Sequence, residues 1–122
     1  MSDIAINSTL TISKGGLKRS FSDVAGFDFV ASSPAVAAGV PTIGTSAHEA
    51  LPMQDVSTAG WARFKNLDST NYVQIGVDST GTFIPMLKLK ALESCVVRLA
   101  TNAPYAKANT ASVQLDYEIF QD

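Results

Sequence analysis

The residues able to do chemistry are few, and none of them stands in a recognisable catalytic pattern. His48 is the only histidine, and together with Glu49 it could form half of an acid–base pair. Nucleophilic catalysis needs a nucleophile, a base and an orienting group in one place. Because no serine or cysteine motif supplies the nucleophile, His48 is better interpreted as a surface or capping residue. We therefore predict no catalytic residues and no enzymatic activity.

Metal and cofactor sites are also poorly supported. Cys95 is the single cysteine, which excludes an internal disulfide and a thiolate cage and favours a buried apolar role. Asp68 and Asp78 flank an apolar segment and could bind calcium, but calcium loops concentrate more carboxylates, so both are better explained as turn formers. No lysine is followed by Ser or Thr, as a phosphate-binding loop requires. The sequence predicts no cofactor, no metal and no small-molecule substrate.

The charge balance argues against nucleic acid as a direct partner. The formal net charge is −2, and only 16% of the residues are charged, against roughly 25% in ordinary soluble domains. Part of the surface could therefore be buried against other chains, or could simply be neutral. Five basic residues could meet an acidic partner or lie on a solvated face: Arg63, Lys65, Lys88, Lys90 and Arg98.

Nothing in the sequence predicts a membrane segment or a secretory leader. The longest apolar run, residues 30–40, contains serines, a proline and many alanines, so it is too weak to span a bilayer. The first residues, Met1-Ser-Asp-Ile, lack a basic segment followed by an apolar one. We expect the chain to be made in a cytoplasm and to stay there until it meets its partner.

Apolar periodicity places most strands in the second half. Residues 113–120 alternate apolar and polar, and residues 61–76 read as two strands joined by a tight turn, hence a β-hairpin. Residues 83–90 and 95–100 are two further strand-like runs. With six to eight short strands and little helix, the chain is predicted to be all-β, an antiparallel β-sandwich or jelly roll, in one domain over residues 1–122.

The first half is expected to cover this sheet. Residues 1–14 form an amino-terminal arm or strand, and after Gly15-Gly16 residues 17–21 could return as its hairpin partner. Residues 27–30 alternate again. Residues 31–44 are rich in Ala, Ser, Pro and Gly and are predicted to be a long contact loop. Residues 46–51 could form one helical turn capped by Ser46.

The predicted core is drawn from the apolar positions of the second half. It comprises Trp61, Phe64, Ile75, Leu89, Leu99, Leu115 and Tyr117. Trp61, Phe64 and Tyr72 could alternatively form a sugar-stacking platform, although aromatic residues at strand spacing are more often core.

Several phrases of the second half, in this order, resemble a known group of proteins. They are Gly60-Trp61, Asn66-Leu-Asp-x-Thr-Asn-Tyr-Val-x-Ile-Gly76, Phe83-x-Pro-x-Leu-Lys-Leu-Lys90, Arg98-Leu-Ala100, Tyr105-Ala-Lys-Ala108 and Leu115-x-Tyr-x-Ile119. Together they resemble small virion proteins of tailed double-stranded-DNA bacteriophages. The first half matches only loosely. The resemblance implies a β-sandwich or jelly-roll subunit that decorates capsids or serves as a minor tail part.

The function implied by this resemblance is that of a capsid decoration, or cement, protein located on the virion. Its implied partners are itself, as a homotrimer, and the phage major capsid protein. A minor tail or tail-tip subunit is the alternative, and a carbohydrate-binding module is a second one. The resemblance pattern has a glycine where this chain has Leu92, so Leu92 either takes a different turn or points outward as a contact.

We expect the partner contacts in the amino-terminal segment, in the 31–44 loop and at this turn. The predicted contact residues are Ile4, Ile6, Pro34, Val36, Val40, Pro41, Ile43 and Leu92.

Overall fold

A computed structural model describes residues 4–23 and 31–122 of the chain. The chain divides into two compact units, Met1–Ser32 and Ser33–Asp122, where its length predicted one domain over residues 1–122. The first unit contributes one hairpin and the second contributes a sandwich. The strand expected at residues 27–30 lies outside the described residues.

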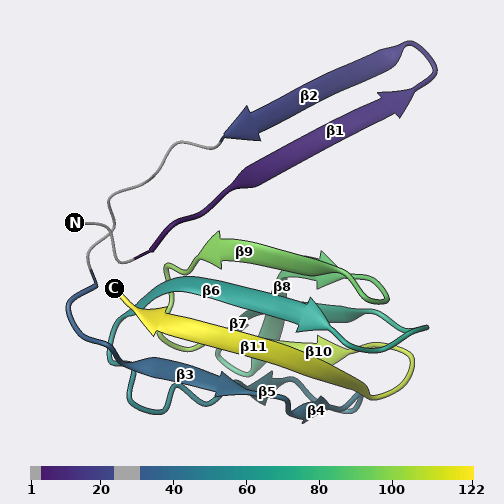
Figure 1. Ribbon diagram of the computed structural model, residues 1–122. Helices are drawn as coiled ribbons and strands as arrows, with labels where there is room; N and C mark the ends of the chain where they lie inside the picture. Colours follow the sequence, from purple (N-terminus) through teal and green to yellow (C-terminus); the bar gives the residue numbers. More distant parts are fainter. Residues whose placement is uncertain (1–3, 24–30) are drawn as a thin grey trace. The chain divides into compact units, whose positions relative to one another are not determined.

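The described residues form eleven β-strands and no helix, so none that could span a membrane. This confirms the all-β, sandwich-like prediction, with more strands than the six to eight expected (Figure 1). The strands are β1 (Ser8–Lys14), β2 (Leu17–Asp23), β3 (Val36–Gly39), β4 (Thr42–Ile43), β5 (Glu49–Ala50), β6 (Ala59–Asn66), β7 (Val73–Ser79), β8 (Thr82–Leu89), β9 (Ser94–Arg98), β10 (Tyr105–Ala108) and β11 (Val113–Gln121).

Two antiparallel sheets make up the sandwich of residues 33–122. One has the strand order β3-β11-β6-β9, with β4 also paired to β11, and the other has the order β5-β10-β7-β8. In Figure 1 the first sheet lies in front of the second. The last strand, β11, is central because it pairs with β3, β4 and β6. Its alternate residues Val113, Leu115, Tyr117 and Ile119 are all buried, as the alternation predicted.

The predicted hairpin of residues 61–76 is wrong. Strands β6 and β7 exist, but β6 pairs with β11 and β9 whereas β7 pairs with β10 and β8, so the chain crosses from one sheet to the other. Asn66, fully buried at the end of β6, holds this crossing. Its side-chain amide donates to the carbonyls of Asn71, Leu89 and Lys90, and its Oδ1 accepts the Asp68 N–H.

The long loop predicted over residues 31–44 is also wrong. It contains β3 and β4, both paired antiparallel with β11, and the prolines flank these strands without interrupting them. The predominance of small side chains hid the pattern, because Ala37 faces the core and is fully buried. Residues 46–51 contain β5 and no helical turn, and the Glu49 carboxylate accepts the Gly44 N–H instead of completing a cap.

The sandwich core includes most of the predicted core residues. Phe64, Ile75, Leu89, Leu115 and Tyr117 are buried, and Leu99 is half-buried and packs against them. The Tyr117 hydroxyl donates to the Pro52 carbonyl at 2.8 Å, which satisfies the one polar atom of that side chain. The prediction that Trp61 lies in the core is wrong. Trp61 alternates with buried Ala62 and is half-buried on the opposite face of β6.

An irregularity in the β7–β8 pairing depends on a glycine. The register shifts between Ile75, which pairs with Leu87, and Gly76, which pairs with Pro85. A Cβ on Gly76 would lie 1.9 Å from the Ile84 carbonyl oxygen, so no side chain fits there. The glycine therefore allows the two backbones to approach closely at this bulge.

The hairpin β1–β2 forms the described part of the first unit, and its existence agrees with the sequence prediction. The strands pair antiparallel over their full length, from Ser8 opposite Asp23 to Lys14 opposite Leu17. Gly15 adopts a φ of +55° in the connecting turn, a conformation that favours glycine.

Candidate interaction surfaces

The outward side of the β3-β11-β6-β9 sheet, here called the outer face, combines apolar and charged side chains. Strand register aligns them in rows across the sheet. Alternation with buried neighbours shows that these side chains point away from the core. The outer face comprises Val36, Ala38, Trp61, Arg63, Lys65, Ser94, Val96, Arg98, Asp116, Glu118 and Phe120.

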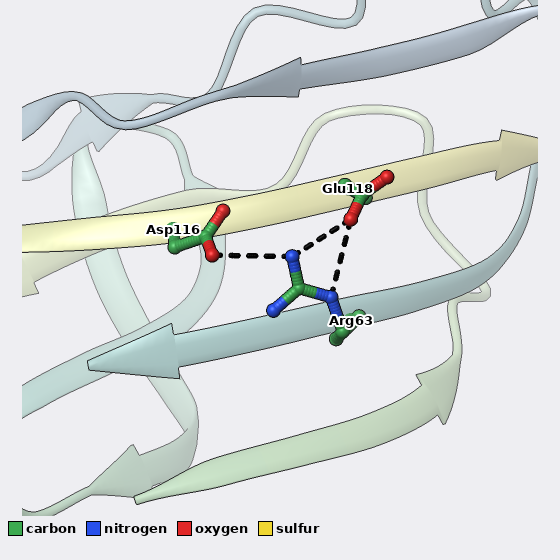
Figure 2. A network of polar contacts seen from close by, with 3 residues as sticks. All are labelled: Arg63, Asp116 and Glu118. Atoms are coloured by element: carbon green, nitrogen blue, oxygen red, sulfur yellow. Dashed lines mark hydrogen bonds and ion pairs between the residues drawn. The ribbon is translucent and has the colours of Figure 1, made fainter. Parts of the chain in front are cut away.

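A fixed charge network lies at the centre of the outer face. Figure 2 shows Arg63 of β6 reaching across to Asp116 and Glu118 of β11. The guanidinium Nη2 lies 2.7 Å from Glu118 and 3.1 Å from Asp116, and Nε also donates to Glu118. The hydrogen bond to Glu118 is the main cause that raises the pKa of Arg63. The arginine is therefore held in one orientation and is largely neutralised.

Apolar side chains flank this network on both sides. Val36 pairs with Phe120, and Trp61 pairs with Arg98, whose guanidinium lies 5.4 Å from the Trp61 ring centroid. Arg98 also binds the Asp122 carboxylate. On the other side of Arg63, its β9 neighbour Val96 is 50% exposed. Aromatic residues, arginine and aliphatic residues in this mixture are typical of protein–protein interfaces.

His48 belongs to a different cluster, on the second sheet. Its Nε2 lies 2.6 Å from Asp78 Oδ1, and its ring stacks on Phe83 and contacts Tyr105 at an angle. The hydrogen bond with His48 is the main cause that lowers the pKa of Asp78. The histidine therefore pairs with a residue thirty positions away, not with Glu49 as the sequence suggested, and it clasps β7 to the segment before β5.

An apolar cleft of about 410 Å³ opens where the two sheets do not close on each other. Ile75, Val77 and Met86 line it from the second sheet, and Val97 and Leu99 line it from the first. Its walls are almost wholly apolar, so it could accept an apolar side chain.

Seven of the eight predicted contact residues are exposed or half-buried, and one lies in the core. Ile4 and Ile6 belong to the first unit and are half-buried. In the second unit Pro34, Val36 and Val40 are exposed and Pro41 is half-buried. The prediction that Ile43 contacts a partner is wrong. Ile43 is 1% exposed and packs in the core, because its position in β4 opposite Val113 turns it inward.

Of the two alternatives raised for Leu92, the structure agrees with the outward side chain and not with a different turn. Leu92 is 58% exposed, and it adopts the left-handed backbone with a φ of +63°, in which a glycine would be unstrained. Its N–H donates to the Asp68 carbonyl at 3.1 Å, which ties this turn to the 66–72 crossing. An exposed apolar side chain is thus carried on a strained turn.

The carboxylates proposed as turn formers do bind backbone N–H groups. Asp68 accepts from Thr70 and Asn71, and the Asn71 bond is the main cause that lowers its pKa, while Asp78 accepts from Gly81. In residues 4–23 and 31–122 no three His, Cys, Asp or Glu side chains gather as a metal site. Cys95 faces inward beside Phe64, and burial raises the pKa of its thiol.

The basic residues and the aromatic residues are both dispersed. Arg63 and Arg98 bind carboxylates on the first sheet, whereas the Lys88 ammonium lies 4.2 Å from the Tyr72 ring centroid on the second. Trp61 lies in β6 of the first sheet, Tyr72 stands just before β7 of the second, and Phe64 is fully buried. The structure therefore does not bring these aromatics together as a sugar-stacking platform.

Comparison with protein-family models, with curated proteins and with solved structures found no match to this chain.

Sequence reasoning missed the outer face because strand order decides which residues become neighbours. The alternation in β6 and β11 assigned Arg63, Asp116 and Glu118 to outward positions, which was the available signal. That Arg63 would lie opposite Glu118 follows only from the pairing of two strands separated by four others along the chain.

Proposed function

We propose that this chain is a non-enzymatic structural protein of a phage virion, and specifically a capsid decoration protein. In this role it binds across the junction between neighbouring major capsid subunits and stabilises the shell. The ordered phrases between Gly60 and Ile119 support the virion assignment through their resemblance to such proteins. One structural observation carries the proposal: the outer face combines apolar side chains with charged side chains that are already held in place.

The outer face is prepared for binding to a protein. Arg63 is already held by two carboxylates, so little side-chain entropy would be lost when a partner covers it. Val96, the Val36–Phe120 pair and Trp61 offer apolar surface on the same face. Arg63 is satisfied within the face and has apolar area around it, so a partner that covers this centre needs to compensate only the one negative charge by which the two carboxylates exceed the guanidinium.

The proposed action on the shell is mechanical. Separating two capsid subunits would cost the free energy of the bridging contacts in addition to that of the subunits' own interface. The same modest interface repeated over a shell resists internal pressure through many simultaneous attachments. Trimeric copies on three-fold positions, as the resemblance implies, would each contact several capsid subunits.

The test is binding of the purified chain to phage shells lacking it, followed by cryo-electron microscopy. Val96→Asp replaces apolar contact area with a third carboxylate beside the Arg63 network and should abolish shell binding. Val96 is 50% exposed, so the substitution should leave the fold intact. Gln74→Asp, on the second sheet, is the matched control and should bind normally. Density on the outer shell would support the proposal. Density confined to the tail, or equal binding by both variants, would refute it.

A further inference from the structure

The register of the β1–β2 hairpin separates its side chains into one apolar face and one polar face. Leu10 pairs with Phe21, Ile12 with Arg19 and Lys14 with Leu17, so these six share a face with Ser8 and Asp23. The opposite face carries only polar side chains: Thr9, Thr11, Ser13, Lys18, Ser20 and Ser22. We call the first set the apolar hairpin face.

Within the first unit, the described residues leave the apolar hairpin face open. Leu10, Ile12, Leu17 and Phe21 are 66%, 43%, 44% and 56% exposed. A two-stranded ribbon is only marginally stable in water by itself, and it becomes stable when an apolar face packs against something. Four large apolar side chains clustered on one face therefore indicate a binding surface.

The charges on this face show which symmetry a second copy could use. Lys14 and Arg19 lie in the half near the turn, and Asp23 lies at the open end. A parallel or three-fold arrangement would bring the turn ends of all copies together, so that Lys14 and Arg19 of one copy would lie near Lys14 and Arg19 of the next. Like charges facing each other across a packed interface are destabilising.

An antiparallel two-fold arrangement avoids this repulsion. If β1 of one copy lies across β1 of the other in the reverse direction, Leu10 meets Ile12 of the second copy, and Phe21 meets Arg19 of the second copy. The first contact is apolar, and the second places a guanidinium over an aromatic ring, which is attractive. The basic end of each hairpin then lies toward the end of the other hairpin that carries Asp23.

We propose that the apolar hairpin face is a self-complementary interface through which two copies of this chain pair about a two-fold axis. Such an isologous contact uses the same patch on both copies and closes after two. The inference concerns the hairpin alone and does not rest on the proposed capsid function. On a virion it would link one decoration unit to the next.

Sedimentation equilibrium of the purified full chain tests the pairing without any phage component. We expect reversible pairing: a monomer–dimer equilibrium, or a trimer–hexamer equilibrium where the chain is already the homotrimer that the resemblance implies. In the double variant Leu10→Ser, Phe21→Ser the dissociation constant should rise by at least about tenfold, since two apolar contacts are lost from each copy. Thr11→Ala, Ser20→Ala is the matched control on the polar face and should leave it unchanged. A wild-type chain that stays monomeric up to about 1 mM, or that forms trimers lost in the double variant, overturns the proposal.

Disulfide cross-linking independently tests whether the two hairpins pack antiparallel. This test does not depend on the serine variant, which could disturb the hairpin itself. In a Cys95→Ala background, Leu10→Cys and Ile12→Cys are prepared separately and then mixed under mild oxidation. The antiparallel arrangement predicts that mixed disulfides form faster than either homodimer, because Leu10 and Ile12 face each other between copies. Fastest cross-linking of either single-cysteine variant with itself would place that position opposite its own equivalent in the second copy and would reject the arrangement proposed here.

Discussion

Two antiparallel ribbons of this chain, β1–β2 and β6–β11, share the same alternation but differ in what covers their apolar side. In β11, Leu115 and Ile119 are fully buried between two sheets. In β1, Leu10 and Ile12 alternate with polar residues in the same way, yet they remain exposed. Alternation therefore predicts which residues share a face, and the presence of a second layer decides whether that face is buried.

The difference implies two kinds of stability. The sandwich of residues 33–122 contains its own core and should fold without a partner. The β1–β2 hairpin has no such core, and its order should depend on what binds it. Substitutions in the two regions should therefore have different effects on stability.

The largest effect is expected in the middle of β11. Leu115→Ala removes a fully buried side chain from the core and should lower the free energy of unfolding by about 2 to 5 kcal/mol. Chemical denaturation followed by tryptophan fluorescence measures it, because Trp61 lies on the neighbouring strand β6. Near-unchanged stability would mean that the sandwich does not depend on this core.

Asn66→Ala is expected to have the next largest effect. It leaves the carbonyls of Asn71, Leu89 and Lys90 without their side-chain donor at the crossing between sheets, which should cost about 1 to 3 kcal/mol. Asn71→Ala is the control, since Asn71 accepts the Asn66 bond through its backbone carbonyl, which this substitution retains. Equal losses in the two variants would contradict the role given to Asn66.

The same residue marks the limit of what the sequence could predict. The polar cluster 66–71 correctly indicated a reversal of the chain between two strands, but a hairpin and a crossing between sheets have the same local signature. The two arrangements differ in whether β6 pairs with β7 or with β11, which lies about fifty residues along the chain. Non-local pairing of this kind leaves no local trace.

Side-chain size explains the other differences. Strong alternation of Val, Leu, Tyr and Ile made β11 evident, whereas alanines made β3 look like a loop. Likewise the candidate site could be predicted only in part. Alternation predicted that Arg63 and Glu118 point outward. It could not predict that the two side chains form a salt bridge.

Leu92→Gly should stabilise the protein. A non-glycine residue in the left-handed region costs roughly 1 to 2 kcal/mol, and the greater freedom of glycine in the unfolded chain offsets part of the gain, leaving up to about 1 kcal/mol. Thermal melts measure it. Leu92→Ala retains the Cβ, so its melting temperature should not rise. A higher melting temperature in both variants would mean that removing the exposed leucine side chain, and not relief of backbone strain, stabilises the protein.

Stability should also fall in acid because of the His48–Asp78 clasp. The pKa of Asp78 is lower in the folded state than in the unfolded one, so its contribution is present above the unfolded pKa, near 4, and is lost as pH falls through the folded value. Melting temperatures measured between about pH 6 and pH 2 should fall less steeply for Asp78→Asn than for the wild type. Parallel curves for the two proteins would remove Asp78 as a cause.

The smallest effect is expected from Leu10→Ala. It deletes the same atoms as Leu115→Ala, but from a side chain that is 66% exposed. In dilute solution, where the hairpin is unpaired, the unfolding free energy of the sandwich should change by no more than about 0.5 kcal/mol. At concentrations where wild-type copies pair, the Leu10→Ala variant should have a lower melting temperature than the wild type. The reason is that binding stabilises the folded chain by mass action, and the variant pairs more weakly. A large loss already in dilute solution would mean that the hairpin is part of the folding unit of the sandwich, and the contrast between the two regions would then disappear.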